Sequence, residues 1–199
     1  MHLSRILIIM VLIAHPGLTK LFAQQQSITE YLAACEMKYG SDADLVNGEK
    51  YFYRYRQAQG TPFLFEDPRS AVITIHEKEF DDQKLRYDIF NQKLVLDYTN
   101  LYGANSSLVL RNEWVESFSF DNKRFIRMRG PEGESGFFQL VTDGPITCVY
   151  RWSKDYLLNL ASGVQSYYFT EPVKESFLVM DGQFHPYRNN RTFLKAFKP

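Results

Sequence analysis

Histidines, cysteines and paired carboxylates are the side chains in this 199-residue chain that could carry acid–base, nucleophilic or metal chemistry. His76 begins a His-Glu-Lys-Glu run that lacks the second histidine of a zinc-protease helix, and His185 precedes a proline after a turn. Cys148 lies among apolar residues, whereas a reactive thiolate needs an electropositive and accessible setting. The sequence contains no nucleophile elbow, phosphate-binding loop or dinucleotide fingerprint. We therefore predict no catalytic residues, no metal ligands and no cofactor.

Acidic residues form three close pairs, which are Glu77 with Glu79, Asp81 with Asp82, and Glu132 with Glu134. Two carboxyl groups about 5–9 Å apart across a scissile bond could hydrolyse a glycoside. Spacing along the chain does not establish such a distance, and solvated turn residues are the simpler interpretation. A hydrolase of envelope or dietary polymers is therefore kept as an alternative.

Composition and charge are typical of one ordinary globular domain. The chain is 45% hydrophobic and 23% charged, and its 23 basic and 23 acidic side chains balance. This balance argues against a nucleic-acid partner, because nucleic-acid-binding proteins usually carry a basic patch or stripe. The length allows a core to form without a metal or a dense set of disulfides.

Residues 1–23 have the pattern of a secretory signal peptide. Arg5 precedes an apolar stretch from Ile6 to Ala14, Pro16 and Gly17 interrupt it, and Ala23 is the best cleavage residue. The stretch is about half as long as a membrane-spanning helix, and no later segment is long enough to span. We predict an exported protein with a single β-rich domain at residues 24–199 and no transmembrane segment in the mature chain. Its expected location is the periplasm, the outer-membrane surface or the extracellular space.

The two cysteines, Cys35 and Cys148, would both remain in the mature chain. Export would bring them to a compartment where disulfides form. A bridge between them would close a long loop, and it requires Cα atoms within about 7 Å. The alternative is two separate packed thiols, and the sequence leaves both interpretations open.

Hydrophobic periodicity predicts a mainly β fold. Ser27 and Glu30 match a capping box that starts a short N-terminal helix ending near Gly40, and Asn190 is expected to cap a short C-terminal helix. Between them, about a dozen short runs with period two alternate with turn residues. We expect an antiparallel open barrel, roll or sandwich.

Aromatic residues are abundant, with 13 Tyr, 16 Phe and 2 Trp. In a β domain they commonly fill the core and pair across strands. The alternative is that some line a face for a ligand or partner, and the candidates are Tyr51, Tyr53, Tyr55, Tyr167 and Tyr168. Alternation places Tyr51, Tyr53 and Tyr55 on one side of their segment, opposite Phe52 and two arginines.

Four segments carry a resemblance that spans most of the predicted mature chain. They are the run from Leu45 to Gly48 followed by Tyr51 and Phe52, residues Gly60 to Leu64, residues Leu85 to Leu96, and residues Asn190 to Phe197. With these segments the chain resembles an uncharacterised group of exported envelope proteins from Bacteroidota. The resemblance implies a cell-envelope location and brings no established activity or site residues.

These observations favour an exported, non-catalytic binding or interaction module of the bacterial cell envelope. Its partner would be an envelope or outer-membrane protein that contacts an exposed aromatic patch or a free strand edge. A carrier of a lipid-like apolar ligand is a further alternative, and it requires a large apolar cavity.

Overall fold

The computed structural model describes residues 42–100, 102–160 and 166–195, all of which belong to one compact unit that begins at Ser41. The predicted signal peptide, the predicted N-terminal helix and Cys35 lie outside the described residues. The described residues therefore comprise the β-rich part of the chain and its C-terminal helix.

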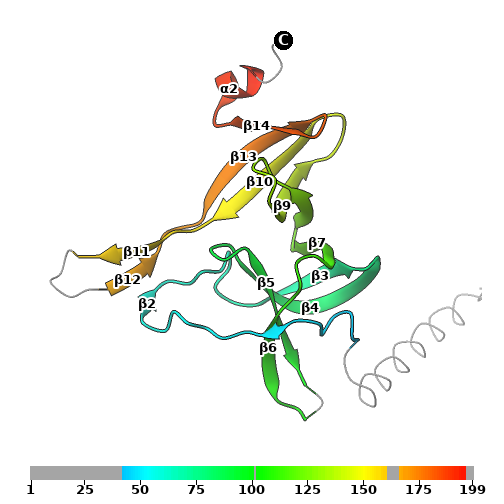
Figure 1. The fold of residues 1–199 in the computed structure, drawn as a ribbon, viewed down its shortest axis with the longest axis vertical. Helices are drawn as coiled ribbons and strands as arrows, with labels where there is room; N and C mark the ends of the chain where they lie inside the picture. The colour runs from blue at the N-terminus through cyan, green and yellow to red at the C-terminus, as the bar shows by residue number, and fades with distance from the viewer. Residues whose placement is uncertain (1–41, 101, 161–165, 196–199) are drawn as a thin grey trace, which may run out of the picture. The chain divides into compact units, whose positions relative to one another are not determined.

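The described residues are mainly β, as the sequence predicts (Figure 1). The elements are β1 (Glu49–Lys50), β2 (Ala58–Gln59), β3 (Arg69–Ile75), β4 (Lys78–Asp88), β5 (Lys93–Thr99), β6 (Asn105–Val109), β7 (Val115–Phe120), β8 (Lys123–Arg129), β9 (Ser135–Thr142), β10 (Thr147–Ser153), β11 (Tyr156–Asn159), β12 (Ser166–Phe169), β13 (Val173–Met180), β14 (Gln183–Tyr187) and α2 (Asn190–Lys195).

Eleven strands form one antiparallel sheet in the order β1-β6-β5-β4-β3-β7-β8-β9-β10-β13-β14. Most neighbouring strands are joined by short hairpins. The exception in the middle of the sheet is the connection after β6: strands β4, β5 and β6 lie on one side of β3, and β7 pairs with the other side of β3. The end strands β1 and β14 do not pair with each other, so the sheet is open rather than a closed barrel.

A second, three-stranded sheet has the order β11-β12-β2. The β11–β12 hairpin continues the ribbon formed by β10 and β13, as Figure 1 shows. The last β10–β13 pair is Ser153 with Val173, and the first β11–β12 pair is Tyr156 with Phe169. Strand β2 pairs in parallel with β12 through Ala58 and Tyr167. This hairpin is therefore held at its base by the large sheet and along one side by β2.

Aromatic and aliphatic side chains on one face of strands β3 to β9 form the main core. Alternation produces this face: Phe118 and Phe120 in β7 are about 1% exposed, whereas the neighbouring Ser117 and Ser119 are less buried. Phe118 stacks on Phe125 with ring centroids 4.8 Å apart. Burial of such aromatic side chains is the main favourable contribution to folding. A smaller cluster on strands β8, β9, β10, β13 and β14 centres on Phe138, Val149 and Phe177.

The C-terminal helix is capped one residue earlier than the sequence predicts. The Asn189 side chain accepts a hydrogen bond from the Thr192 amide at 3.0 Å, and the Phe193 amide donates to the Asn189 carbonyl. Asn189 is thus the N-cap, because its side chain satisfies an otherwise unpaired amide of the first helical turn.

Candidate functional site

The five tyrosines predicted as a ligand or partner face lie in two neighbouring segments. Tyr51, Tyr53 and Tyr55 are half-buried in an extended segment that is not a strand, and Tyr167 and Tyr168 lie in β12. The predicted alternation is present, since Phe52 and Arg54 are exposed between the half-buried tyrosines. Residues 51–55 form no strand: the Tyr51 amide donates a hydrogen bond to the Ser107 carbonyl of β6 at 2.9 Å, and the tyrosines of the segment pack by ring contacts.

Tyr55 brings the two segments together. Its ring contacts Phe169 at 5.0 Å and Tyr156 at 5.3 Å between centroids, and it also contacts Phe90 at 6.0 Å. Tyr156 in turn stacks on Tyr167 at 5.1 Å with an interplanar angle of 11°. This aromatic cluster fixes the base of the β11–β12 hairpin against the loop after β4. Tyr55 therefore has a packing role, whereas Tyr167 keeps an exposed edge.

Lys154 provides a polar anchor for the same hairpin. Its ammonium group donates to the carbonyl oxygens of Thr61 and Phe63 at 2.8 and 2.9 Å. Burial lowers the pKa of Lys154, and nearby carboxylates partly offset this effect. The base of the hairpin is thus fixed by both ring packing and hydrogen bonds.

Beyond this base, the hairpin exposes apolar side chains on both of its faces. Leu157 and Leu158 are each 42% exposed and Leu160 is 68% exposed, and Leu158 lies opposite Tyr167 across the ribbon. These leucines are absent from the residues predicted to form a ligand or partner face, because a short apolar run is equally typical of a strand that is covered on both faces. The signal that could have found them is the absence of any charged residue between Asp155 and Glu171.

Strand β11 is also an open edge of its sheet. The Thr170 amide donates to the Asp155 carbonyl at 3.0 Å, so Asp155 points its backbone groups towards β12. Because an antiparallel strand alternates the direction of these groups, Tyr156 and Leu158 point theirs away from β12. Within the described part of the chain, no residue forms a hydrogen bond with the backbone of Tyr156 or Leu158 on that outer side.

The other sheet edges in the described residues carry features that discourage pairing. Strands β1 and β2 have two residues each, and the edge strand β14 contains Pro186, which lacks an N–H donor. Short edge strands and edge prolines are common means by which proteins prevent unwanted strand addition. Strand β11 has four residues, no proline and no charge. It is therefore the least protected edge of the described structure.

A second feature is an open pocket of about 420 Å³ beside β1, lined by Tyr51, Tyr55, Asp88 and Asn91 together with charged residues at its rim. Asp88 is 1% exposed, and its Oδ1 accepts hydrogen bonds from the amides of Phe90 and Asn91 at 3.1 and 2.8 Å. Its Oδ2 accepts a bond from the Asn91 side chain at 2.8 Å. Burial raises the pKa of Asp88, and the hydrogen bonds from Asn91 and Phe90 oppose this rise.

The hydrogen bonds that Asp88 accepts satisfy backbone amides in the turn between β4 and β5, so its main role is structural. The charged residues that line the pocket also include Glu49, Lys50, Arg54 and Lys93, and these charges do not suit the apolar ligand of a lipid carrier.

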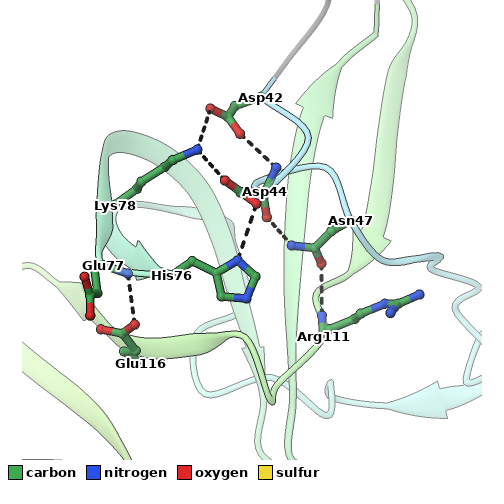
Figure 2. A network of polar contacts seen from close by, with 8 residues as sticks. All are labelled: Asp42, Asp44, Asn47, His76, Glu77, Lys78, Arg111 and Glu116. Carbon is green, nitrogen blue, oxygen red and sulfur yellow. Dashed lines mark hydrogen bonds and ion pairs between the residues drawn. The ribbon is translucent and has the colours of Figure 1, made fainter.

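His76 lies in the polar network of Figure 2. Its Nδ1 lies 3.4 Å from Asp44 Oδ1, and its ring packs on Trp114 with centroids 4.7 Å apart. Asp44 also pairs with Lys78, and the hydrogen bond from Lys78 is the main cause that lowers the pKa of Asp44. The network joins residues 42–47 to the β3–β4 turn, which is a structural role that needs no catalytic function.

The remaining candidates for chemistry do not converge. Cys148 is half-buried, and Cys35, with which it would form the possible disulfide, lies outside the described residues. Glu134 of the third acidic pair forms an ion pair with Arg151 at 2.6 Å. The described residues contain no group of three or more His, Cys, Asp or Glu side chains that could hold a metal ion. They also include no helix that is long and apolar enough to cross a membrane.

The geometry of the described residues is what identifies the site, since comparison with known proteins gives no match. No protein-family model, curated protein or solved structure matches this chain. The candidate functional site is therefore the outer edge of β11 with the exposed side chains of the β11–β12 hairpin.

Proposed function

We propose that this protein is an exported, non-catalytic interaction module of the bacterial cell envelope that binds a protein partner by strand addition to β11. The observation that carries the proposal is the open, uncharged edge of β11, flanked by exposed Leu157, Leu158 and Leu160. In strand addition, backbone hydrogen bonds provide affinity and alternating side chains provide specificity. Tyr156 and Leu158 supply the outward backbone groups that this mode requires.

The surroundings of the hairpin support the same function. Ring contacts of Tyr55 and the two bonds of Lys154 hold the base, so the edge is presented by a fixed ribbon. A preorganised edge loses little conformational entropy when a partner binds. The export of the chain, which the proposal includes, is supported by the signal-peptide pattern of residues 1–23.

A photo-reactive amino acid at Leu160 tests this proposal in cells. Illumination is expected to yield a covalent adduct with a protein in the envelope fraction, because Leu160 adjoins the proposed contact edge. The same amino acid at Tyr102, which is 94% exposed and lies in the loop after β5, is the matched control and should yield no specific adduct. Adding Leu158→Pro should remove the Leu160 adduct. Equal adducts at both positions, or an adduct that persists with Leu158→Pro, would contradict strand addition at β11.

A further inference from the structure

We infer that the strand bound at β11 is β11 of a second copy of this chain, paired antiparallel about a twofold axis through Leu157. The inference rests on the proposed function and names its partner. It predicts one continuous six-stranded sheet in the order β2-β12-β11-β11-β12-β2. Closed twofold symmetry is the commonest arrangement of homo-oligomers, and it uses the same surface patch on both copies.

The backbone of β11 is self-complementary in this register. Tyr156 and Leu158 both point their N–H and C=O groups outward, and Leu157 between them points its groups to β12. With the axis through Leu157, Tyr156 of each copy faces Leu158 of the other. Each of these two pairs exchanges two backbone hydrogen bonds, so the outward groups of all four residues are satisfied.

The side chains fit the same register. The two Leu157 side chains meet on one face of the new sheet, and each is 42% exposed in a single copy. On the other face Leu158 meets Tyr156 of the second copy, next to Tyr167. Apolar surface on both faces of the ribbon is thus buried by one contact.

Charge favours the antiparallel arrangement over a parallel one. Strand β11 carries no charge, and Asp155 at its start is the nearest exposed acidic residue. In the antiparallel register Asp155 faces the Asn159 position of the second copy, so the two aspartates lie at opposite ends of the contact. A parallel pairing would place the two aspartates side by side, which is destabilising.

Sedimentation analysis of three purified proteins tests the hydrogen bonds. The wild type should show a concentration-dependent dimer. Leu158→Pro removes an N–H donor on the outer side only, a position that edge strands tolerate, and it should yield a folded monomer at every concentration. Leu158→Ala keeps the donor and should still dimerise, with a weaker dissociation constant. A monomeric wild type, or a Leu158→Pro protein that dimerises like the wild type, would overturn the inference.

Disulfide trapping tests the register itself. The variants carry Cys35→Ser and Cys148→Ser, together with either Leu157→Cys or Leu158→Cys. The two Leu157 positions form a pair without hydrogen bonds, with Cα atoms about 4.5 Å apart, which a disulfide can bridge. The two Leu158 positions are offset by two residues, so their Cα atoms lie about 8 Å apart and should not be bridged. Fast oxidation of Leu157→Cys to a covalent dimer, without that of Leu158→Cys, is the expected result, and the reverse order would overturn the register.

The two proposals fail in different ways. In the cross-linking experiment at Leu160, an adduct with twice the mass of the chain supports the second copy as partner. An adduct with another protein that Leu158→Pro removes would overturn this inference and leave the proposed function standing. The lack of any adduct would overturn both.

Discussion

Replacing Phe118 with alanine is expected to lower the free energy of unfolding by about 3–5 kcal/mol, as is usual for a buried phenylalanine. Phe118 is 1% exposed, and its ring lies 4.8 Å from Phe125, 5.1 Å from Phe137 and 5.4 Å from Tyr87 between centroids. Truncation therefore removes both the buried apolar area and the contacts that these rings make with it. Urea unfolding followed by tryptophan fluorescence gives the change directly.

The matched control is Phe52→Ala. Phe52 is 66% exposed, so its truncation should change stability by less than about 1 kcal/mol. Similar losses for the two variants would show that Phe118 is not at the centre of the core. That result would contradict the assignment of the core to the inner face of strands β3 to β9.

Replacing Asp88 with alanine is expected to destabilise the protein by about 2–4 kcal/mol, because two part-buried hydrogen bonds from turn amides to its buried carboxylate are lost. These donors are the amides of Phe90 and Asn91, and the side chain of Asn91 loses its partner as well. Asp88→Asn is the control, since its remaining oxygen can still accept both backbone bonds. Thermal unfolding should therefore rank the variants as wild type and Asp88→Asn above Asp88→Ala, and equal values for the Asn and Ala variants would contradict this role.

The difference in stability between the wild type and Asp88→Asn should depend on pH, and the direction follows from the raised pKa of Asp88. Burial raises the pKa of Asp88 in the folded state, so between the unfolded and the folded pKa the folded state binds more protons. The contribution of Asp88 to the free energy of unfolding therefore increases as pH falls through this window. Relative to Asp88→Asn, the wild type should gain stability from pH 7 to pH 4, and a relative loss would contradict the raised pKa.

Local periodicity predicted much of the fold. The period-two runs identified a mainly β chain and its antiparallel character, and alternation placed Tyr51, Tyr53 and Tyr55 on one side of their segment. The sequence did not reveal that residues 51–55 form no strand and pack by their rings, with a backbone hydrogen bond from Tyr51 to Ser107 of β6. Ring contacts with Phe90 and Phe169 are long-range, and such packing overrides local strand propensity.

The candidate site was harder to predict than the fold. Two of the five tyrosines, Tyr167 and Tyr168, lie on the proposed hairpin, but the exposed leucines beside them were not among the predicted residues. Whether a strand is central or at an edge depends on its neighbours. Here the decisive pairing is between β12 and the two residues of β2, which are distant in the sequence and too short to form a recognisable strand pattern. Period-two alternation therefore identifies β11 as a strand without showing that it is an edge.

Amide hydrogen exchange along β11 tests the central claim, which is that its outer edge is free for a partner strand. In dilute protein, the Leu157 amide should be protected by β12, whereas the Leu158 amide should exchange rapidly because it points outward. At high concentration, or with the partner bound, the Leu158 amide should become protected while Leu157 changes little. A Leu158 amide that is protected equally at all concentrations would show that the edge is already covered and would contradict the account.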